Sequence, residues 1–202
     1  MVDVSAKSLE LRLPELLPGK GHALHLEARA CVLRPERYDV AYLDPPYNQH
    51  SYYSNYHIWE TLVRGDTPSA YGIARKREDC RTSKSAFNVR KAAWEAIRDV
   101  VLHVKARHVV LSFSNEGFFT DEAISGLLAE RFSEVALVRM DSARYVGARI
   151  GIHNLRGERV GKVSHVRNTE WVFIAGPDAA AAAHTGMARL SVRVDTPLEN
   201  AI

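Results

Sequence analysis

A short apolar stretch that runs directly into two prolines constrains this 202-residue chain more than any other feature. Residues 38–43, Tyr-Asp-Val-Ala-Tyr-Leu, have the composition of a buried strand. They are followed by Asp44-Pro45-Pro46-Tyr47-Asn48, in which neither proline can donate a backbone hydrogen bond and each holds the preceding residue extended. We therefore predict a strand that ends in a stiff loop, at the end of the strand where open α/β sheets place their ligands.

The groups on this proline loop, residues 44–48, suit the recognition of a planar base that carries an amino group. The carboxylate of Asp44 and the rigid proline carbonyls can accept hydrogen bonds, and the ring of Tyr47 can stack on a base. The simpler interpretation is a proline turn capped by an aspartate, with no chemistry. The order of the motifs that follow favours the first interpretation.

Strand and helix patterns alternate along the rest of the chain, which indicates an α/β sheet. Strands are predicted at residues 22–28, 38–43, 108–113, 134–139 and 169–175. Helices are predicted at residues 57–64, 86–105 and 120–131, the last with Thr120 as its cap. The polar segments 65–85 and 141–168 are predicted to be long loops. We divide the chain into a lead-in (1–22), a catalytic domain (23–177) and a tail (178–202) that we do not assign.

Composition predicts one globular, cytoplasmic domain without a membrane segment. The hydrophobic content of 46% and the charged content of 25% are ordinary for such domains. No apolar run reaches the length of a membrane-spanning helix, and the first residues lack the apolar core of a signal peptide. The two cysteines, Cys31 and Cys80, predict neither a disulfide framework nor a metal site.

Basic residues gather in two stretches, 75–98 and 139–167, although the net charge is only +3. Such stretches suit contact with a phosphate backbone, while a solvated surface is the alternative. We predict DNA contact, and we choose one representative set of side chains from the two stretches: Arg75, Arg77, Lys84 and Arg144.

Several blocks of the chain, in order, resemble the Dam-like class of adenine-specific (N6) DNA methyltransferases. The likeness extends roughly from Ala23 to Pro177. Its blocks are Leu43-Asp44-Pro45-Pro46-Tyr47-Asn48, Tyr52-Tyr53-Ser54-Asn55-Tyr56-His57-Ile58-Trp59-Glu60-Thr61-Leu62, Lys84-Ser85-Ala86-Phe87, Leu111-Ser112-Phe113-Ser114-Asn115-Glu116-Gly117 and Asn168-Thr169-Glu170-Trp171-Val172-Phe173. The resemblance implies transfer of a methyl group from S-adenosyl-L-methionine to the amine of adenine in double-stranded DNA, as in restriction-modification.

The resemblance also implies roles for individual residues. Asp44 and the carbonyl of Pro45 would accept the two amine hydrogens, Pro46 would fix the loop, and Tyr47 would stack on a flipped base. Glu27 matches the place of an acidic residue near the cofactor, where Asp44 also lies. Further substrate contacts are expected from Tyr53, Asn55 and Asn115, and structural roles from His57 and Glu170.

Three features of that class have no match in this sequence. The glycine-rich loop of the Phe-x-Gly-x-Gly kind is missing, because Gly19 and Gly21 follow Pro18 without a preceding strand. The acidic residue after the second strand and the target-recognition segment are missing too. The sequence therefore resembles the C-terminal portion of such an enzyme, with a Rossmann-like methyltransferase sheet that is incomplete at its N-terminal side.

In that arrangement strand 38–43 would lie at an open edge of the sheet, which is a liability. A complementary chain carrying the glycine-rich loop could fill the gap, residues 22–28 could pair there, or the protein could be poorly stable. Three functions stay open: a methyltransferase part that needs a complementary half, an inactive remnant or DNA-binding accessory, and a methyltransferase for another nucleic-acid or protein amine. The basic stretches favour nucleic acid over protein.

Overall fold

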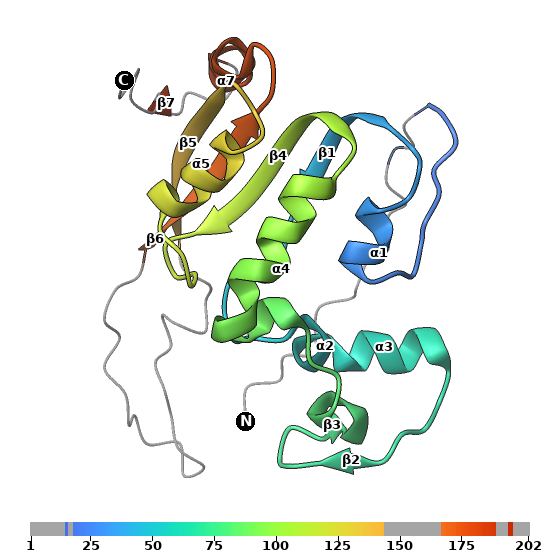
Figure 1. Ribbon diagram of the computed structural model, residues 1–202. Helices are drawn as coiled ribbons and strands as arrows, with labels where there is room; N and C mark the ends of the chain where they lie inside the picture. The colour runs from blue at the N-terminus through green and yellow to red at the C-terminus, as the bar shows by residue number, and fades with distance from the viewer. Residues whose placement is uncertain (1–14, 16–17, 144–166, 189–193, 196–202) are drawn as a thin grey trace.

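The computed structural model describes residues 15, 18–143, 167–188 and 194–195, and a mixed five-stranded sheet forms its centre (Figure 1). The strand order is β1-β4-β6-β5-β7, in which β1 and β4 are parallel and β6 is antiparallel to both of its neighbours. The five strands are β1 Tyr38–Leu43, β4 Ala106–Ser114, β5 Val135–Ala143, β6 Arg167–Ala175 and β7 Val194–Asp195. This arrangement confirms the α/β class and the predicted antiparallel last long strand.

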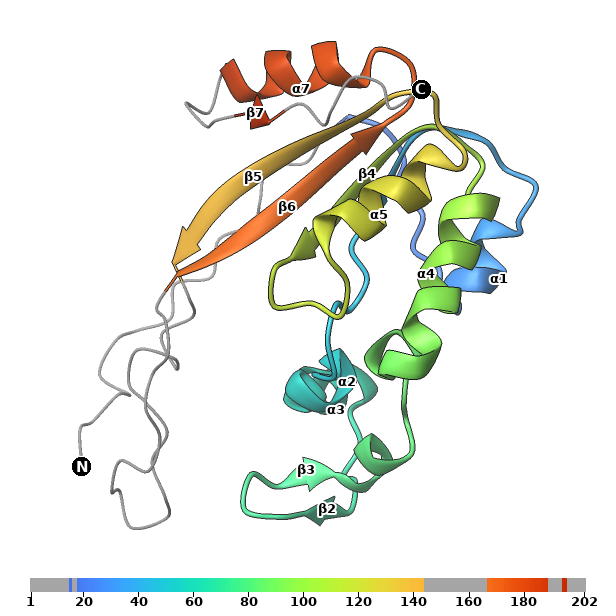
Figure 2. The ribbon, with the colours of Figure 1, turned by 60° about the vertical axis from the view of Figure 1, so that its left-hand side comes forward.

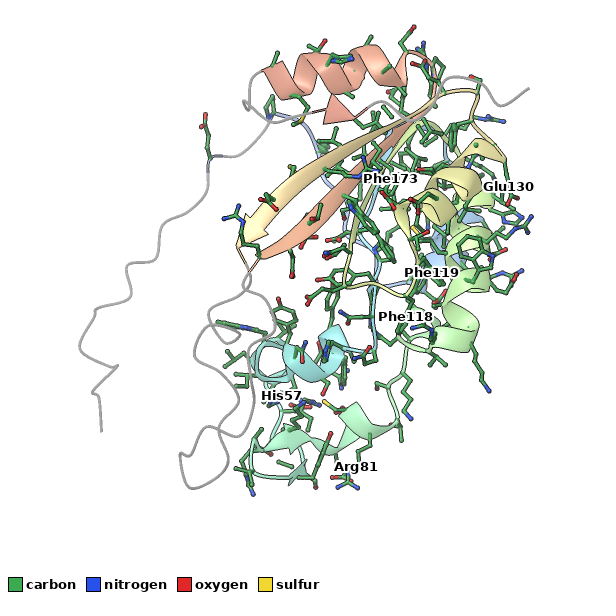
Figure 3. All side chains as sticks on the ribbon, turned by 90° about the vertical axis from the view of Figure 1, so that its left-hand side faces the viewer. His57, Arg81, Phe118, Phe119, Glu130 and Phe173 are labelled. Atoms are coloured by element: carbon green, nitrogen blue, oxygen red, sulfur yellow. The ribbon has the colours of Figure 1, made fainter. Side chains whose placement is uncertain are left out.

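One face of the sheet carries the main apolar core. Helices α4, Arg90–His103, and α5, Asp121–Ala129, cover this face (Figure 2). Alternate residues of β4 and β6 point into it, so that Leu111 and Phe173 are fully buried (Figure 3). The predicted apolar side of α4 is buried through Ala93, Ile97, Val100 and Val101. Thr120 caps α5 as predicted, since its hydroxyl accepts a hydrogen bond from the backbone N–H of Ala123 at 3.2 Å.

Helix α7, Ala179–Ala188, covers only part of the opposite face, over β5 and β6 (Figure 2). Its small side chains Ala179 and Ala183 pack directly on Ala136 and Val138 of β5. The tail that the sequence left unassigned therefore contains a helix that belongs to the sheet. The part of this face formed by β1 is uncovered among the described residues: Tyr38, Val40 and Tyr42 are each more than half exposed.

The edge of the sheet at β1 differs from the sequence-based prediction in one respect. Residues 22–27 form no strand, and the helix α1, Ala28–Val32, begins directly after them. Glu27 caps this helix, because its carboxylate accepts a hydrogen bond from the backbone N–H of Arg29 at 2.9 Å. The predicted strand at 22–28 is thus wrong, and in the described part of the chain β1 pairs with β4 alone.

A small unit lies beyond the carboxyl ends of β1 and β4 (Figures 1 and 2). It consists of helices α2, Tyr52–Asn55, and α3, His57–Arg64, and of a hairpin of β2, Ala70–Tyr71, and β3, Lys76–Arg77. Two 3-10 turns, Glu78–Arg81 and Ala86–Asn88, lead back to α4. The predicted loop 65–85 therefore contains regular structure.

Arg77 holds this unit together. Its side chain is only 3% exposed, and its guanidinium donates to both carboxylate oxygens of Asp66, at 2.6 and 2.8 Å. It also donates to Asp79 at 3.1 Å and to the hydroxyl of Thr61 on α3 at 3.0 Å. Arg77 thus links the hairpin, the following turn and α3, which does not fit its predicted role as a phosphate contact.

We predict that Arg77→Gln loosens the hairpin, because a neutral amide cannot neutralise Asp66 and Asp79 together. Amide hydrogen exchange should become faster at Glu78, whose N–H donates to the carbonyl of Ser69 across the base of the hairpin. Arg75→Gln is the matched control, since Arg75 is exposed at the hairpin turn. Equal protection of Glu78 in both variants would show that the ion cluster does not hold the hairpin.

Candidate active site

Asp44 follows β1 directly, and the pairing of β1 with β4 sets its position. Leu43 lies opposite Leu111, which places Asp44 beside Ser112. The hydroxyl of Ser112 donates to the carboxylate of Asp44 at 2.8 Å, and the hydroxyl of Tyr42 donates to Ser112 at 3.1 Å. The carboxylate is therefore oriented by a neutral donor, which leaves its other lone pairs able to accept hydrogen bonds from a ligand.

The proline loop is fixed at its other end by the segment after β4. The backbone N–H of Phe118 donates to the carbonyl of Tyr47 at 2.9 Å. The ring of Tyr47 meets Phe113 edge to face, with ring centroids 5.9 Å apart. Phe119, beside Phe118 in Figure 3, packs on Trp94 of α4, with ring centroids 5.0 Å apart. These aromatic contacts hold the loop in place without using its carboxylate.

Three carboxyl groups surround Tyr47. Besides Asp44 they belong to Glu116, which accepts a hydrogen bond from the side-chain amide of Asn168 at 2.8 Å, and to Glu170 of β6. Burial raises the pKa of the Glu170 carboxyl, and the charges of Glu116 and Asp44 raise it further, although a hydrogen bond with Ser114 opposes the shift. Burial and these same three acids raise the pKa of the Tyr47 hydroxyl, which stays neutral.

A cavity of about 360 Å³ opens beside the proline loop. Asp44, Pro45 and Pro46 form one side of it, and Glu27 lies on its wall. The remaining lining is mostly apolar and includes Leu43, Phe87, Ile97, Val100 and Leu111. The structure thus brings the two predicted cofactor residues, Asp44 and Glu27, to a single cavity that could hold a flat apolar group with polar ends.

Two further cavities continue from this one toward the small unit of α2 and α3. The first, of about 470 Å³, is lined by Tyr52, Tyr53 and Lys84 among others. The second, of about 380 Å³, is lined by Asn55 and Lys84. The hydroxyl of Tyr53 donates a hydrogen bond to Asp79 at 2.9 Å, which anchors the side chain where it lines the first of these two cavities. Tyr53, Asn55 and Lys84 are therefore available to a substrate.

The other predicted contacts are placed differently. The side chain and backbone of Asn115 exchange hydrogen bonds with the backbone of Thr169, at 3.2 and 3.1 Å, which ties β4 to β6. Arg75 is exposed at the hairpin turn, and Arg77 is buried in its ion cluster. Arg144 lies outside the described residues.

Sequence reasoning missed Ser112 as the partner of Asp44. A signal for it exists: Ser112 and Ser114 alternate with the buried residues Leu111 and Phe113 at the end of a strand that is apolar from Val109 to Leu111. Two hydroxyls on one face at the end of such a strand indicate a polar site rather than a core. Within the described residues, no group of three or more His, Cys, Asp or Glu side chains is arranged to hold a metal ion, and no helix is long and apolar enough to cross a membrane.

The sequence is similar to a known family and to several characterised proteins. A family model described as D12 class N6 adenine-specific DNA methyltransferase matches residues 6–115. The modification methylase StsI of Streptococcus sanguinis is 35% identical over 107 residues, which are 53% of this chain and 16% of that protein. The type II methyltransferase M.FokI of Planomicrobium okeanokoites is 37% identical over 90 residues, 45% of this chain and 14% of that protein. M.NlaIII of Neisseria lactamica is 29% identical over 139 residues, 68% of this chain and 40% of that protein.

No solved structure matches the chain. The chain spans only about a sixth of the length of the first two relatives, so the likeness concerns one part of those proteins. The matched segment contains β1, the proline loop, α4 and β4, which are the elements that build the site around Asp44. The family match covers more than half of the sequence, and the chain therefore belongs to the D12 class of N6 adenine-specific DNA methyltransferases.

Proposed function

We propose that this chain supplies the catalytic loop and the base pocket of an S-adenosyl-L-methionine-dependent enzyme that methylates the amino group of adenine in double-stranded DNA, as part of restriction-modification. One observation carries the proposal: Asp44 is held by Ser112 at the edge of a cavity that Glu27 also lines. The relatives StsI and M.FokI are named as modification methylases or type II methyltransferases, which agrees with this activity.

The cavity beside Asp44 fits an adenosine-type cofactor in its chemistry. Apolar walls such as Ile97 and Leu111 suit a purine ring, and the carboxylates of Glu27 and Asp44 suit hydroxyl or ammonium groups. S-Adenosyl-L-methionine, when bound, supplies the methyl group as an electrophile. The order β5, β6, β4 and β1, with β6 antiparallel, supports a methyltransferase form of the Rossmann-like sheet.

The residues of the chain have to position the amine of adenine, whose lone pair is delocalised into the ring. Asp44 and the carbonyl of Pro45 accept its two hydrogens and so direct the lone pair toward the methyl donor. No strong base is needed, since the proton can leave to water after the transfer. A base inside a duplex cannot reach Asp44, so it has to be flipped out, and Tyr47 stacks on it. Correct positioning is the main contribution to the rate.

The uncovered edge of β1 supports the need for a complementary segment. The outer edge of the strand is unpaired among the described residues, and Tyr38, Val40 and Tyr42 expose apolar surface beside it. Such an edge is a ready template for another strand. We propose that a segment carrying the glycine-rich loop pairs there and closes the cavity at Glu27 and Asp44.

The first test measures methyl transfer from radiolabelled S-adenosyl-L-methionine to double-stranded DNA, by the chain together with the complementary segment. Asp44→Ala should lower the rate by about 100-fold or more, because the oriented acceptor is lost. Ser112→Ala should lower it by about tenfold, and Ser112→Thr should restore most of it, since the hydroxyl remains. Full activity of Asp44→Ala would refute its role, and DNA binding without methylation by the wild type would favour an accessory protein.

Tyr47 allows a second test. Tyr47→Phe should methylate nearly as well as the wild type, because the ring and not the neutral hydroxyl contacts the base. Tyr47→Ala should weaken the binding of the flipped adenine by roughly 1–3 kcal/mol through lost stacking. The measured quantity is the KM for duplex DNA. Equal KM values for the two variants would contradict the stacking role.

Glu170 gives a prediction about pH. Its pKa is raised in the folded protein, so its carboxyl favours folding while it is protonated and opposes folding as the pH rises through the raised value. Glu170→Gln should therefore raise the urea midpoint of unfolding at pH 8. This gain should become smaller as the pH is lowered toward 4.5, the ordinary pKa of a glutamate carboxyl. Glu95→Gln, an exposed site on α4, is the control. A gain that does not depend on pH would contradict this account.

A further inference from the structure

The three cavities around the proline loop join into one groove. The cavity at Asp44 and the next one share the lining residues Leu26, Glu27, Pro46 and Ser85. The second and third cavities share Ser51, Ser83, Lys84 and Asn88. A nucleotide on the proline loop can therefore extend from Pro46, which also lines the second cavity, to the far cavity beside α2 and the hairpin, and the first cavity is left to the cofactor.

The far cavity has a different chemistry from the near one. It is lined by two lysines, by hydroxyl groups and by side-chain amides, and none of its described lining residues is an aspartate or a glutamate. The ammonium group of Lys76 donates to the hydroxyl of Ser54 at 2.9 Å. We call the set Lys76, Lys84, Ser51, Ser54, Asn55 and Asn88 the lysine pocket.

The two lysines of the lysine pocket differ from nearby arginines in their partners. Three arginines of the same unit have carboxylate partners: Arg64 pairs with Glu60, Arg77 with Asp66, and Arg81 with Glu78. Within the described part of the chain, neither Lys76 nor Lys84 forms such a pair. Two ammonium groups beside several neutral hydrogen-bonding groups form a site for an oxyanion.

We propose that the lysine pocket binds a phosphate group, and that in the enzyme this phosphate is a backbone phosphodiester next to the flipped adenine. The second half of the statement rests on the proposed function, because the groove connects the pocket to Asp44, where the base binds. A base at Asp44 and a phosphate at Lys84 would fix one nucleotide at two points. Phosphate contacts of this kind set position and do not read sequence.

Hairpin geometry explains why Lys76, and not Arg77, serves this pocket. Successive residues of a strand point to opposite sides, so Arg77 faces the ion cluster with Asp66 while Lys76 faces Ser54 and the cavity. Lysine acts on phosphate as a compact point charge, which suits a pocket whose other partners are hydroxyls and amides.

The test measures the affinity of the full chain for a labelled single-stranded oligonucleotide with one adenine among thymines, over a series of salt concentrations. Each lost phosphate contact should reduce the slope of log affinity against log salt by about 0.7 for single strands. Lys76→Gln with Lys84→Gln removes both cations from the one phosphate of the pocket and should therefore reduce the slope by about 0.7. Arg37→Gln with Arg107→Gln removes the same charge from exposed sites outside the groove and outside the two basic stretches, and it should leave the slope nearly unchanged.

Lys84→Gln alone keeps the test valid if the double variant folds poorly, because Lys84 is exposed, and this variant should lose part of the same slope of about 0.7. An unchanged slope, or an equal fall in the control pair, would overturn the proposal. Neutral methylphosphonates at the phosphates flanking the adenine should weaken binding to the wild type and not to the double variant. If the double variant keeps the wild-type salt slope and differs only in that inorganic phosphate no longer competes with the oligonucleotide, the pocket binds free anions and the DNA assignment is wrong.

The two proposals can fail separately. If Asp44→Ala abolishes methylation while the lysine variants keep the wild-type salt slope, the proposed function stands and the lysine pocket does not. If the lysine variants lose slope but the enzyme with its complementary segment never methylates adenine, the phosphate site stands and the proposed reaction does not.

Discussion

The parallel pairing of β1 with β4 is the constraint on which the site depends. Leu111 is fully buried in the core, which fixes β4, and its register with Leu43 then fixes where β1 ends. A shift of one residue would turn Ser112 away from Asp44 and would expose the apolar side of β1. The hydrogen bond from Ser112 to Asp44 is thus a consequence of the packing and pairing of the adjacent residues Leu111 and Leu43.

Charge is distributed along the groove in a way that would orient the nucleotide of the proposed reaction. Asp44 and Glu27 line the groove at one end, and the lysine pocket lies at the other end. Carboxyl groups accept hydrogen bonds from an amine but repel a phosphate, while ammonium groups do the reverse. A nucleotide would therefore enter in one direction, even before any sequence is read.

The parts of the fold that the sequence predicted are those that local patterns determine. Strand β1, the buried face of α4 and the Thr120 cap depend on residues within a few positions of one another. The segment 22–28 shows strand-like alternation, but a strand needs a partner, and Glu27 instead caps α1. No local pattern decides between these outcomes, because they differ in tertiary contacts.

Among the basic residues, sequence could not separate structural from available charges. Lys76 and Arg77 are neighbours with the same sign, yet only Arg77 meets Asp66 and Asp79, which come from either side of the hairpin. Which one turns inward depends on the register of a hairpin two residues long on each side, Ala70 with Arg77 and Tyr71 with Lys76. Ser112 was missed for a similar reason, since its partner follows a strand 68 positions earlier in the chain.

Helix α3 exposes apolar side chains and turns a polar one toward the protein, which is the opposite of an ordinary surface helix. Its Thr61 faces the ion cluster of Arg77, and its apolar residues Ile58, Trp59, Leu62 and Val63 are each more than 60% exposed. Salt that is excluded from protein surfaces strengthens apolar association, while it screens the charges that attract DNA. High concentrations of such salts would therefore weaken the proposed DNA contacts and at the same time strengthen apolar contacts made by α3.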